Sequence, residues 1–465
     1  MRTVALGFLP SHRDPFNENW AVAMRDRCIK AMAGMPEVEL VVPSPELTLG
    51  GLVRDDADAE RVIELFCDRD IEGLLIGTMT FGDEISCAEV ASRLGVPTLL
   101  FGTKEGPFTE DGNRLSDSFC GTLSVASALR RRGLSSRFLD ILFPEEALFQ
   151  DGIQDFARTC AGVNGFLQAR VGMVGTRPER FETCAFSEVP LIEQFDQRVV
   201  QMSMADLFAQ AAAVDPKDPD VLRILDEMKS GLYQVCMDAE SLLKSAKLEV
   251  VLLRWAEEKE LSCMAVQCWS AMQNVYGISS CLCMGRLTAQ GMMTACEVDV
   301  LGALTMLLQY ETALNATVPH FIDWTIQHQE HENQFYAWHC GNAPLCLAGN
   351  PDQVKIGTHS ILDRVSDPST CQGVGEFQVA PGPVTLNRLI EEDGDFRLLI
   401  TNGSIVEEDA IRRGSWSWVE VPDLKLLYRT LIEEGFIHHA SMIHGDLSNS
   451  LEDLCDYLGI EAVLV

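Results

Sequence analysis

Long apolar runs are absent from this 465-residue sequence, because no segment reaches the ~18 to 20 apolar residues that a membrane-spanning helix requires. The first residues, MRTVALGFLPSHRDPF, also lack the apolar segment and the small-residue cleavage site of a signal peptide. Their pattern predicts a core strand followed by a loop. We therefore expect a cytoplasmic protein with no membrane partner.

Basic residues are few, with 36 Lys and Arg against 69 Asp and Glu, which gives a formal net charge of −33. The acidic residues are spread along the whole chain and are not gathered in one tail. A phosphate backbone would be repelled over most of such a surface. We therefore expect no nucleic-acid partner.

Paired cysteines with zinc-type spacing are missing, although the chain contains 16 cysteines. Most of them sit singly inside apolar segments, as buried thiols do in a reducing compartment. The one close pair, Cys281 and Cys283, has a single residue between its members, which is too little to indicate a redox motif or a zinc knuckle. The pattern excludes a four-thiolate zinc site.

Nucleotide-binding motifs are also missing, since no dinucleotide fingerprint follows the first apolar run and no Walker phosphate loop occurs. Residues 1–165 instead alternate short apolar runs, such as VALGFL and GLLIGTM, with amphipathic helical stretches. This alternation predicts five β–α units in a flavodoxin-like, doubly wound parallel sheet. Such sheets bind ligands in the loops after their strands, which makes Arg13 and Asn17 candidate substrate contacts, with ordinary polar loops as the alternative.

A second α/β domain is predicted over residues 166–317, beginning near the run RVGMVG. In its last part, MTACEVDVLGALTMLLQ, a strand-like run leads into an apolar helix. Glu297 and Asp299 lie at this junction. Because carboxylates at a helix start usually cap it, we expect Asp299 to be an N-cap.

Residues 318–465 form a predicted β-rich domain, because the runs become alternating and aromatic-rich with Gly, Pro and Asn between them. This pattern is typical of a small antiparallel barrel or sandwich. The fold class is therefore α/β, with two doubly wound parallel-sheet domains followed by a barrel-like C-terminal domain.

Histidine is nearly confined to the last third of the chain, where eight of the nine histidines lie. The segment HFIDWTIQHQEHENQFYAWHC predicts a hairpin with its tip at His331, which places Asp323 directly opposite His339. A one-residue slip would break this pairing. Such a pair can bind a metal or simply form a hydrogen bond, whereas His328 and His331 at the tip are expected to be solvated.

Two segments resemble those of the L-fucose isomerase family. MTACEVDVLGALTMLL is similar to its metal-site segment, in which a Glu ends a strand just before an Asp-containing helix start, and that family has an Asp some two dozen residues later, as Asp323 is here. GFIHHASMIHGDLSNSLEDLCDYLGIE is similar to its C-terminal segment and implies a ligand at His439. Related arabinose isomerases carry a further ligand histidine, which implies His339.

The resemblance covers the whole chain in domain order and implies a metal-dependent aldose–ketose isomerase acting on an unphosphorylated monosaccharide through a cis-enediolate. It implies Mn²⁺ or a similar divalent ion, consistent with a set of carboxylates and imidazoles, and a homo-oligomer (trimer, tetramer or hexamer) with shared active sites. Glu297 and Asp323 would move the proton. The expected metal ligands are Glu297, Asp323, His439 and His339, and the expected substrate contacts are Arg13, Asn17, Asn342 and His444.

Several alternatives stay open at this point. A metal-dependent lyase or aldolase would use the same enediolate chemistry, and a hydride shift would replace the enediolate. A non-catalytic sugar-binding protein with tandem α/β domains would need no metal. Arg13 and Arg286 either meet an acidic substituent of the sugar or form surface salt bridges.

Overall fold

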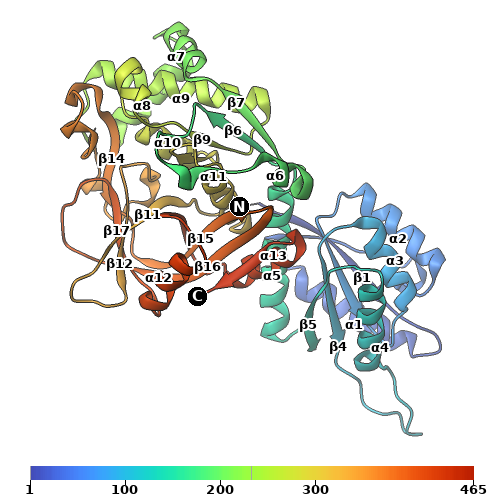
Figure 1. The fold of residues 1–465 in the computed structure, drawn as a ribbon. Helices are drawn as coiled ribbons and strands as arrows, with labels where there is room; N and C mark the ends of the chain where they lie inside the picture. The colour runs from blue at the N-terminus through green and yellow to red at the C-terminus, as the bar shows by residue number, and fades with distance from the viewer. Residues whose placement is uncertain (1, 232) are drawn as a thin grey trace. The chain divides into compact units, whose positions relative to one another are not determined.

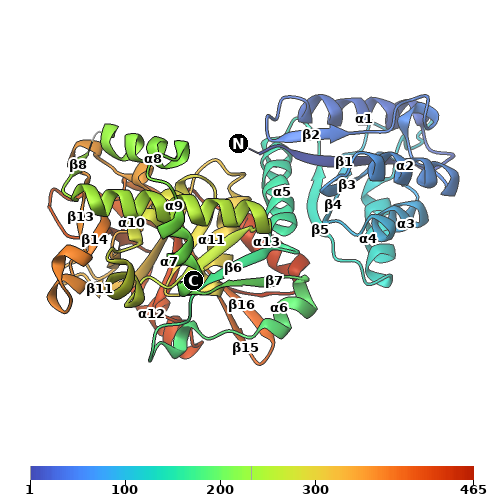
Figure 2. The ribbon, with the colours of Figure 1, turned by 90° about the horizontal axis from the view of Figure 1, so that it is seen from above.

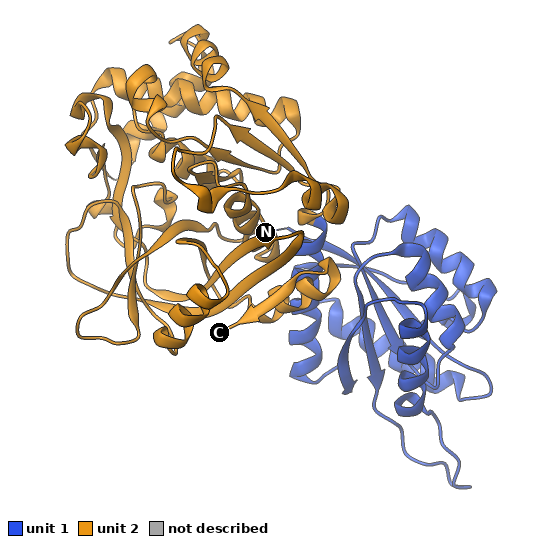
Figure 3. Cartoon of the chain, viewed as in Figure 1, with its two compact units in different colours: residues 1–164 blue, residues 165–465 orange. Residues whose placement is uncertain are grey.

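The computed structural model describes residues 2–231 and 233–465 (Figure 1). The chain divides into two compact units, residues 1–164 and residues 165–465 (Figure 3). Within the described residues, no helix combines the length and the apolar character needed to cross a membrane.

Unit 1 is built on a five-stranded parallel sheet with strand order β2-β1-β3-β4-β5, and helices lie along both of its sides (Figure 2). Leu9, Ile76 and Leu100 belong to the apolar core that packs against α2, α3 and α4. On the other face, the ring of Phe101 meets Phe149 of α5 at 5.2 Å. The predicted doubly wound sheet is therefore present. Its elements are β1 (Val4–Ser11), α1 (Glu18–Met32), β2 (Val38–Val41), α2 (Asp56–Asp68), β3 (Gly73–Thr78), α3 (Glu84–Leu94), β4 (Thr98–Thr103), α4 (Ser118–Arg131), β5 (Arg137–Leu142) and α5 (Ala147–Phe166).

Unit 2 contains a four-stranded parallel sheet of order β10-β9-β6-β7. Its strands are β6 (Arg170–Val174), β7 (Arg198–Met202), β9 (Cys263–Val266) and β10 (Met293–Cys296). Its helices are α6 (Glu188–Phe195), α7 (Met204–Ala213), α8 (Pro219–Ser230), α9 (Ala239–Lys259), α10 (Cys281–Ala289) and α11 (Val300–Thr312).

Helix α11 is buried on nearly every side, as its continuous apolar sequence VLGALTMLL requires. It contacts β9 and β10 of the parallel sheet and also β15 and β18 of the second sheet. The helix therefore joins the two sheets of unit 2, and its N-terminus lies where they meet.

The second sheet of unit 2 has ten strands in the order β19-β16-β15-β18-β11-β12-β17-β14-β13-β8. An additional pairing of β16 with β17 closes a barrel of β16, β15, β18, β11, β12 and β17. Its apolar core includes Ile322, Leu386 and Val419. The elements are β8 (Gln234–Val235), β11 (His320–Gln327), β12 (Gln334–His339), β13 (Lys355–Thr358), β14 (Gln372–Gln378), β15 (Gly382–Glu392), β16 (Asp395–Val406), β17 (Ser415–Glu420), α12 (Leu424–Glu433), β18 (His439–His444), α13 (Ser448–Leu458) and β19 (Glu461–Leu464).

These three sheets confirm the predicted fold class, including the barrel-like C-terminal part. The domain boundaries at residues 165 and 317 stay predictions.

The register predicted for the β11–β12 hairpin is correct near its tip and wrong beyond it. Ile326 pairs with Tyr336 as expected, but Asp323 pairs with Trp338 and not with His339. The reason is a β-bulge at Thr325, an extra residue whose hydroxyl donates a hydrogen bond to the carbonyl of Tyr336. The bulge shifts every pair between it and the start of β11 by one residue.

Candidate metal centre

The turn between β10 and α11 presents the first carboxylate of the candidate site. Glu297 and Val298 both adopt left-handed backbone conformations, with φ of 58° and 56°. Such conformations cost about 1–3 kcal/mol each and occur where the surrounding fold imposes them, often at functional sites. Glu297 Oε1 accepts a hydrogen bond from Trp269 Nε1 at 3.1 Å, which leaves Oε2 for another partner.

The second carboxylate and an imidazole come from neighbouring barrel strands. Asp323 of β11 is the direct antiparallel partner of His439, the first residue of β18. His439 Nε2 lies 3.6 Å from Asp323 Oδ1 and 3.2 Å from Glu297 Oε2. The structure therefore brings Glu297, Asp323 and His439 together.

The other nitrogen of His439 is held by Asp299. As predicted, Asp299 caps α11, since its Oδ1 accepts from the backbone N–H of Gly302 at 2.8 Å. Its Oδ2 lies 2.8 Å from His439 Nδ1, and its two oxygens also pair with the buried guanidinium of Arg388 in β15. An ionised carboxylate can only accept, so His439 donates from Nδ1. Its Nε2 faces Glu297 and Asp323 and presents a lone pair there when the ring is neutral, the state that can bind a cation.

This arrangement leaves three acceptor atoms facing one another. Within the described parts of the chain, Glu297 Oε2, Asp323 Oδ1 and His439 Nε2 are buried and have no hydrogen-bond partner. Buried acceptors that converge without a donor are unfavourable unless a cation lies between them. Two carboxylate oxygens and one imidazole nitrogen form a donor set that fits Mn²⁺ or a similar divalent ion.

The pKa shifts of the site reflect the same charge pattern. Burial, together with the charge of Glu297, raises the pKa of Asp323 to about 7. Burial opposes ionisation of Asp299, yet Arg388 and His439 hold its pKa well below the usual range. Burial also opposes protonation of His439, but its contacts with Asp299, Cys184 and Glu297 raise its pKa well above the ordinary value. In metal-free protein the site therefore attracts a proton.

Two further side chains adjoin these ligands. Atoms of Asp323, His339 and His439 lie within 4.8 Å of one another, as do atoms of Cys184, Glu297 and His439. Burial, reinforced by His439 and the other nearby imidazoles, lowers the pKa of His339 well below its ordinary value. Cys184 Sγ is 3.8 Å from His439 Nδ1, on the side of the ring that faces Asp299.

The remaining predicted residues of the barrel have other neighbours. Asn342 is buried beside His320. His444 donates from Nε2 to the carbonyl of Ala380 at 2.8 Å. At the hairpin tip, His328 and His331 are exposed or half-buried, with their rings 4.5 Å apart. Arg286 forms ion pairs with Glu227 and Glu249, as the salt-bridge alternative expects.

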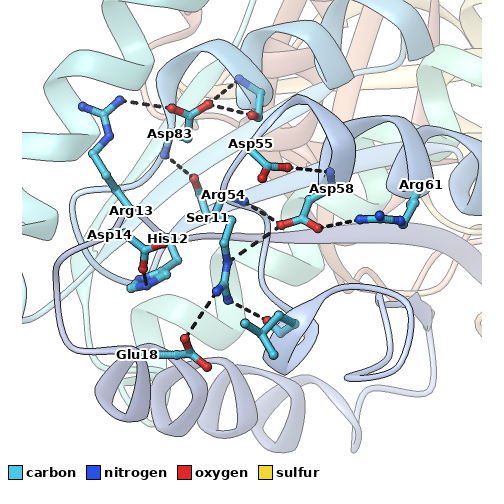
Figure 4. Close-up of polar contacts among 12 residues, drawn as sticks. Ser11, His12, Arg13, Asp14, Glu18, Arg54, Asp55, Asp58, Arg61 and Asp83 are labelled. Carbon is cyan, nitrogen blue, oxygen red and sulfur yellow. Dashed lines mark hydrogen bonds and ion pairs between the residues drawn. The ribbon is translucent and has the colours of Figure 1, made fainter.

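Arg13, labelled in Figure 4, and Asn17 lie in unit 1, in the loop after β1. Arg13 pairs with Asp83 at 3.2 Å and lies over the ring of Phe81. The side chain of Asn17 caps α1 by accepting from the N–H of Trp20. Both side chains therefore have structural partners within their own unit.

A third group of possible ligands, His12, Asp14 and Glu18, also lies in unit 1 (Figure 4). His12 Nε2 is 3.4 Å from Asp14 Oδ1, but the carboxylate of Asp14 is largely exposed. Glu18 pairs with Arg54 at 3.3 Å, so that a cation would meet a positive charge already in place. The group in unit 2 is therefore the stronger metal candidate.

The sequence did not indicate that Arg388 and Cys184 lie at the site, or that Asp299 contacts His439 in addition to capping α11. One signal was available, because Arg388 stands in the apolar strand segment VTLNRLI, where a buried arginine needs a carboxylate partner. The partner itself is 89 residues away.

Comparisons with known proteins match both ends of the chain to one family. A model described as the fucose/sulfoquinovose isomerase N-terminal domain matches residues 7–167, and one described as the L-fucose isomerase C-terminal domain matches residues 337–465. The two segments together cover more than half of the chain, and the second contains His339 and His439.

The curated relatives are similar over most of their length. A sulfoquinovose isomerase from Alkalicoccus urumqiensis is 26% identical over 391 residues, 82% of this chain and 84% of the relative. One from Clostridium sp. (strain MSTE9) is 25% identical over 84% of this chain and 85% of the relative. One from Priestia aryabhattai is 21% identical over 99% of both chains.

Proposed function

The chain belongs to the fucose/sulfoquinovose isomerase family, and from this premise we propose that it interconverts an aldose and its ketose at a divalent-metal centre formed by Glu297, Asp323 and His439. The observation that carries the proposal is the convergence of three buried acceptor atoms that, among the described residues, have no hydrogen-bond partner. A divalent ion held there would supply a Lewis acid for the two sugar oxygens involved in the reaction.

The residues of the chain supply the proton chemistry. Isomerisation removes a proton from C2 of the open-chain aldose and returns it to C1, while the hydroxyl proton moves from O2 to O1. We assign these transfers to the carboxylates of Glu297 and Asp323.

We propose a six-carbon, unphosphorylated sugar as substrate, with sulfoquinovose as the first sugar to test. The support comes from the family description and from the names of the relatives, which share 21–26% of their residues with this chain. The test incubates the protein and Mn²⁺ with sulfoquinovose, L-fucose and L-arabinose and detects the ketose by ¹³C NMR. Formation of no ketose from sulfoquinovose and L-fucose would contradict the proposal, and conversion of the five-carbon L-arabinose alone would contradict a six-carbon substrate.

Metal dependence is the first prediction. EDTA should abolish turnover. Mn²⁺ should restore it better than Mg²⁺, because an imidazole ligand favours Mn²⁺ over Mg²⁺. Elemental analysis of the purified protein checks the same point without an assay. Full turnover by metal-stripped protein would contradict it, and a protein that binds sugar without metal would fit the alternative of a non-catalytic binding protein.

We further propose that the enzyme is a homo-oligomer with shared active sites. The side chains of Glu297 and Asp323 are 13% and 20% exposed, so solvent reaches part of each side chain although the atoms that face one another are buried. An enediolate has to be kept from bulk water. Arg13 and Asn17, the candidate sugar contacts after β1, belong to the other unit of the chain.

A further inference from the structure

We propose that His339 is not a metal ligand but donates a hydrogen bond from Nε2 to an oxygen of the bound sugar. This inference rests on the isomerase function proposed above and assigns a substrate contact within that site. It differs from the expectation, drawn from the arabinose isomerases, that His339 ligates the metal.

The first step is the hydrogen-bond partner of His339 Nδ1. The backbone N–H of Cys340 donates to this nitrogen at 2.9 Å. Nδ1 must therefore present its lone pair, which rules out a proton on that atom. An imidazole with an acceptor at Nδ1 carries its one proton on Nε2.

His439 has the opposite arrangement. The carboxylate of Asp299 accepts from its Nδ1, so in the neutral, metal-binding ring its Nε2 carries a lone pair. The two rings face a common space, since one nitrogen of each ring and a carboxylate oxygen of Asp323 lie within 4.8 Å of one another. Because Nδ1 of His339 already accepts from Cys340, its nitrogen available to this space is Nε2. His439 therefore offers that space an acceptor, and His339 offers it a donor.

A metal ligand needs a lone pair, and His339 Nε2 could provide one only if the contact with Cys340 were lost and the proton moved to Nδ1. The ring has little freedom for such a change. It is 1% exposed, its centroid is 5.6 Å from that of Phe321, and the indole of Trp338 lies nearly parallel to it, 8° apart in orientation.

The N–H group at His339 Nε2 needs a hydrogen-bond acceptor. The atom is buried and, in the part of the chain that the structure describes, has no hydrogen-bond partner. A hydroxyl or carbonyl oxygen of a sugar at the metal centre would satisfy it. When the proton leaves C2, negative charge develops on the sugar oxygens, and a fixed N–H donor stabilises that charge without transferring its own proton.

The test separates ligation from substrate contact. His339→Leu removes the donor and His339→Gln restores an N–H donor, while His439→Gln removes the predicted ligand. Mn²⁺ affinity is measured by calorimetry, and the coupling of imidazole nitrogen to Mn²⁺ is measured by electron spin echo spectroscopy. His331→Gln, at the exposed hairpin tip, is the matched control.

We expect both His339 variants to bind Mn²⁺ within about threefold of wild type and to keep the nitrogen coupling, whereas His439→Gln loses the coupling and at least about tenfold in affinity. With the sugar that wild type converts, kcat/KM should fall about 100-fold in His339→Leu and recover in part in His339→Gln. Circular dichroism confirms that each variant is folded.

Two results would overturn the inference. One is a loss of Mn²⁺ affinity and nitrogen coupling in both His339 variants that equals the loss in His439→Gln. The other is an unchanged kcat/KM in a His339→Leu protein that binds Mn²⁺ normally. If wild type converts no sugar, the proposed function fails, but the metal measurements still decide whether His339 is a ligand.

Discussion

Arg388 is a buried charge that acts on the metal site through a residue it pairs with. Its guanidinium and the side chain of Asp299 are each 1% exposed, and the pair keeps Asp299 ionised. An ionised Asp299 fixes the proton of His439 on Nδ1 and so directs Nε2 toward the two carboxylates. Arg388 thus influences, through Asp299, which nitrogen of His439 carries the proton.

Replacement of Asp299 by Asn should weaken metal binding by about 10- to 100-fold, because the amide neither fixes the proton of His439 nor neutralises Arg388. Mn²⁺ calorimetry on the folded variant measures this. Cys184→Ser is the matched control, since Sγ lies near the same nitrogen at the longer distance of 3.8 Å. Equal losses of Mn²⁺ affinity in Asp299→Asn and Cys184→Ser would indicate that the sulfur of Cys184 takes part in metal ligation.

Metal binding should depend on pH through Asp323. Its raised pKa of about 7 means that the neutral carboxyl prevails in metal-free protein below that pH, and the metal must displace the proton. Apparent Mn²⁺ affinity should fall by at least about tenfold per unit as the pH drops below 7, and binding near pH 7 should release at least one proton, because the raised pKa of His439 adds a second proton to displace. Calorimetry in two buffers of different ionisation enthalpy measures the number of protons released. An Mn²⁺ affinity that does not change between pH 6 and pH 8 would contradict the prediction.

At the scale of elements, the N-terminus of α11 links the parallel sheet to the barrel. Asp299 caps the helix, Glu297 precedes it, and the helix packs against β18, which begins with His439. Gly302 sits where this helix approaches the barrel. A Cβ at Gly302 would lie 2.6 Å from Phe321 Cε2 and 2.7 Å from Asp299 Oδ2.

Gly302→Ala should therefore disturb the cap and the site together. We expect a loss of about 1–3 kcal/mol in the free energy of unfolding, as for overpacked cores, and weaker Mn²⁺ binding. Urea unfolding and calorimetry measure the two effects. Gly34→Ala is the control, because nothing lies within 4 Å of a Cβ there. A fully stable Gly302→Ala protein with normal metal affinity would show that the helix start is not tightly constrained.

The hairpin of β11 and β12 shows what the sequence can and cannot predict. The period of two in HFIDWTIQH correctly predicts strands and the tip, but a bulge at Thr325 leaves no trace in that pattern because it depends on one local hydrogen bond. Glu297, Asp323 and His439 lie together, as the resemblance to the L-fucose isomerase family implies and as the hairpin spacing alone does not predict. The apolar segment around Arg388 indicates a buried arginine that needs a carboxylate, but its pairing with Asp299 was not predictable, since it depends on strand β15 packing against α11.

At the scale of the whole molecule, shared active sites are the last prediction. The candidate metal ligands all come from unit 2, whereas Arg13 and Asn17 come from unit 1, and each unit has its own core. A neighbour's unit 1 could close the site against water and add sugar contacts. The net charge of −33 does not prevent assembly, because surface repulsion is screened over ~8 Å at physiological ionic strength and buried apolar surface offsets the remainder.

The test combines two inactive proteins. Glu297→Gln removes a proton-transfer group and a metal ligand, and the double variant Arg13→Ala, Asn17→Ala removes the candidate sugar contacts of unit 1. Each should fold and be nearly inactive alone. After dissociation and reassociation together, mixed oligomers should regain a measurable fraction of activity, because some sites combine an intact unit 1 with an intact unit 2. A wild-type protein that is fully active as a monomer by light scattering would refute the proposal, and mixed oligomers without recovered activity would show that each chain completes its own site.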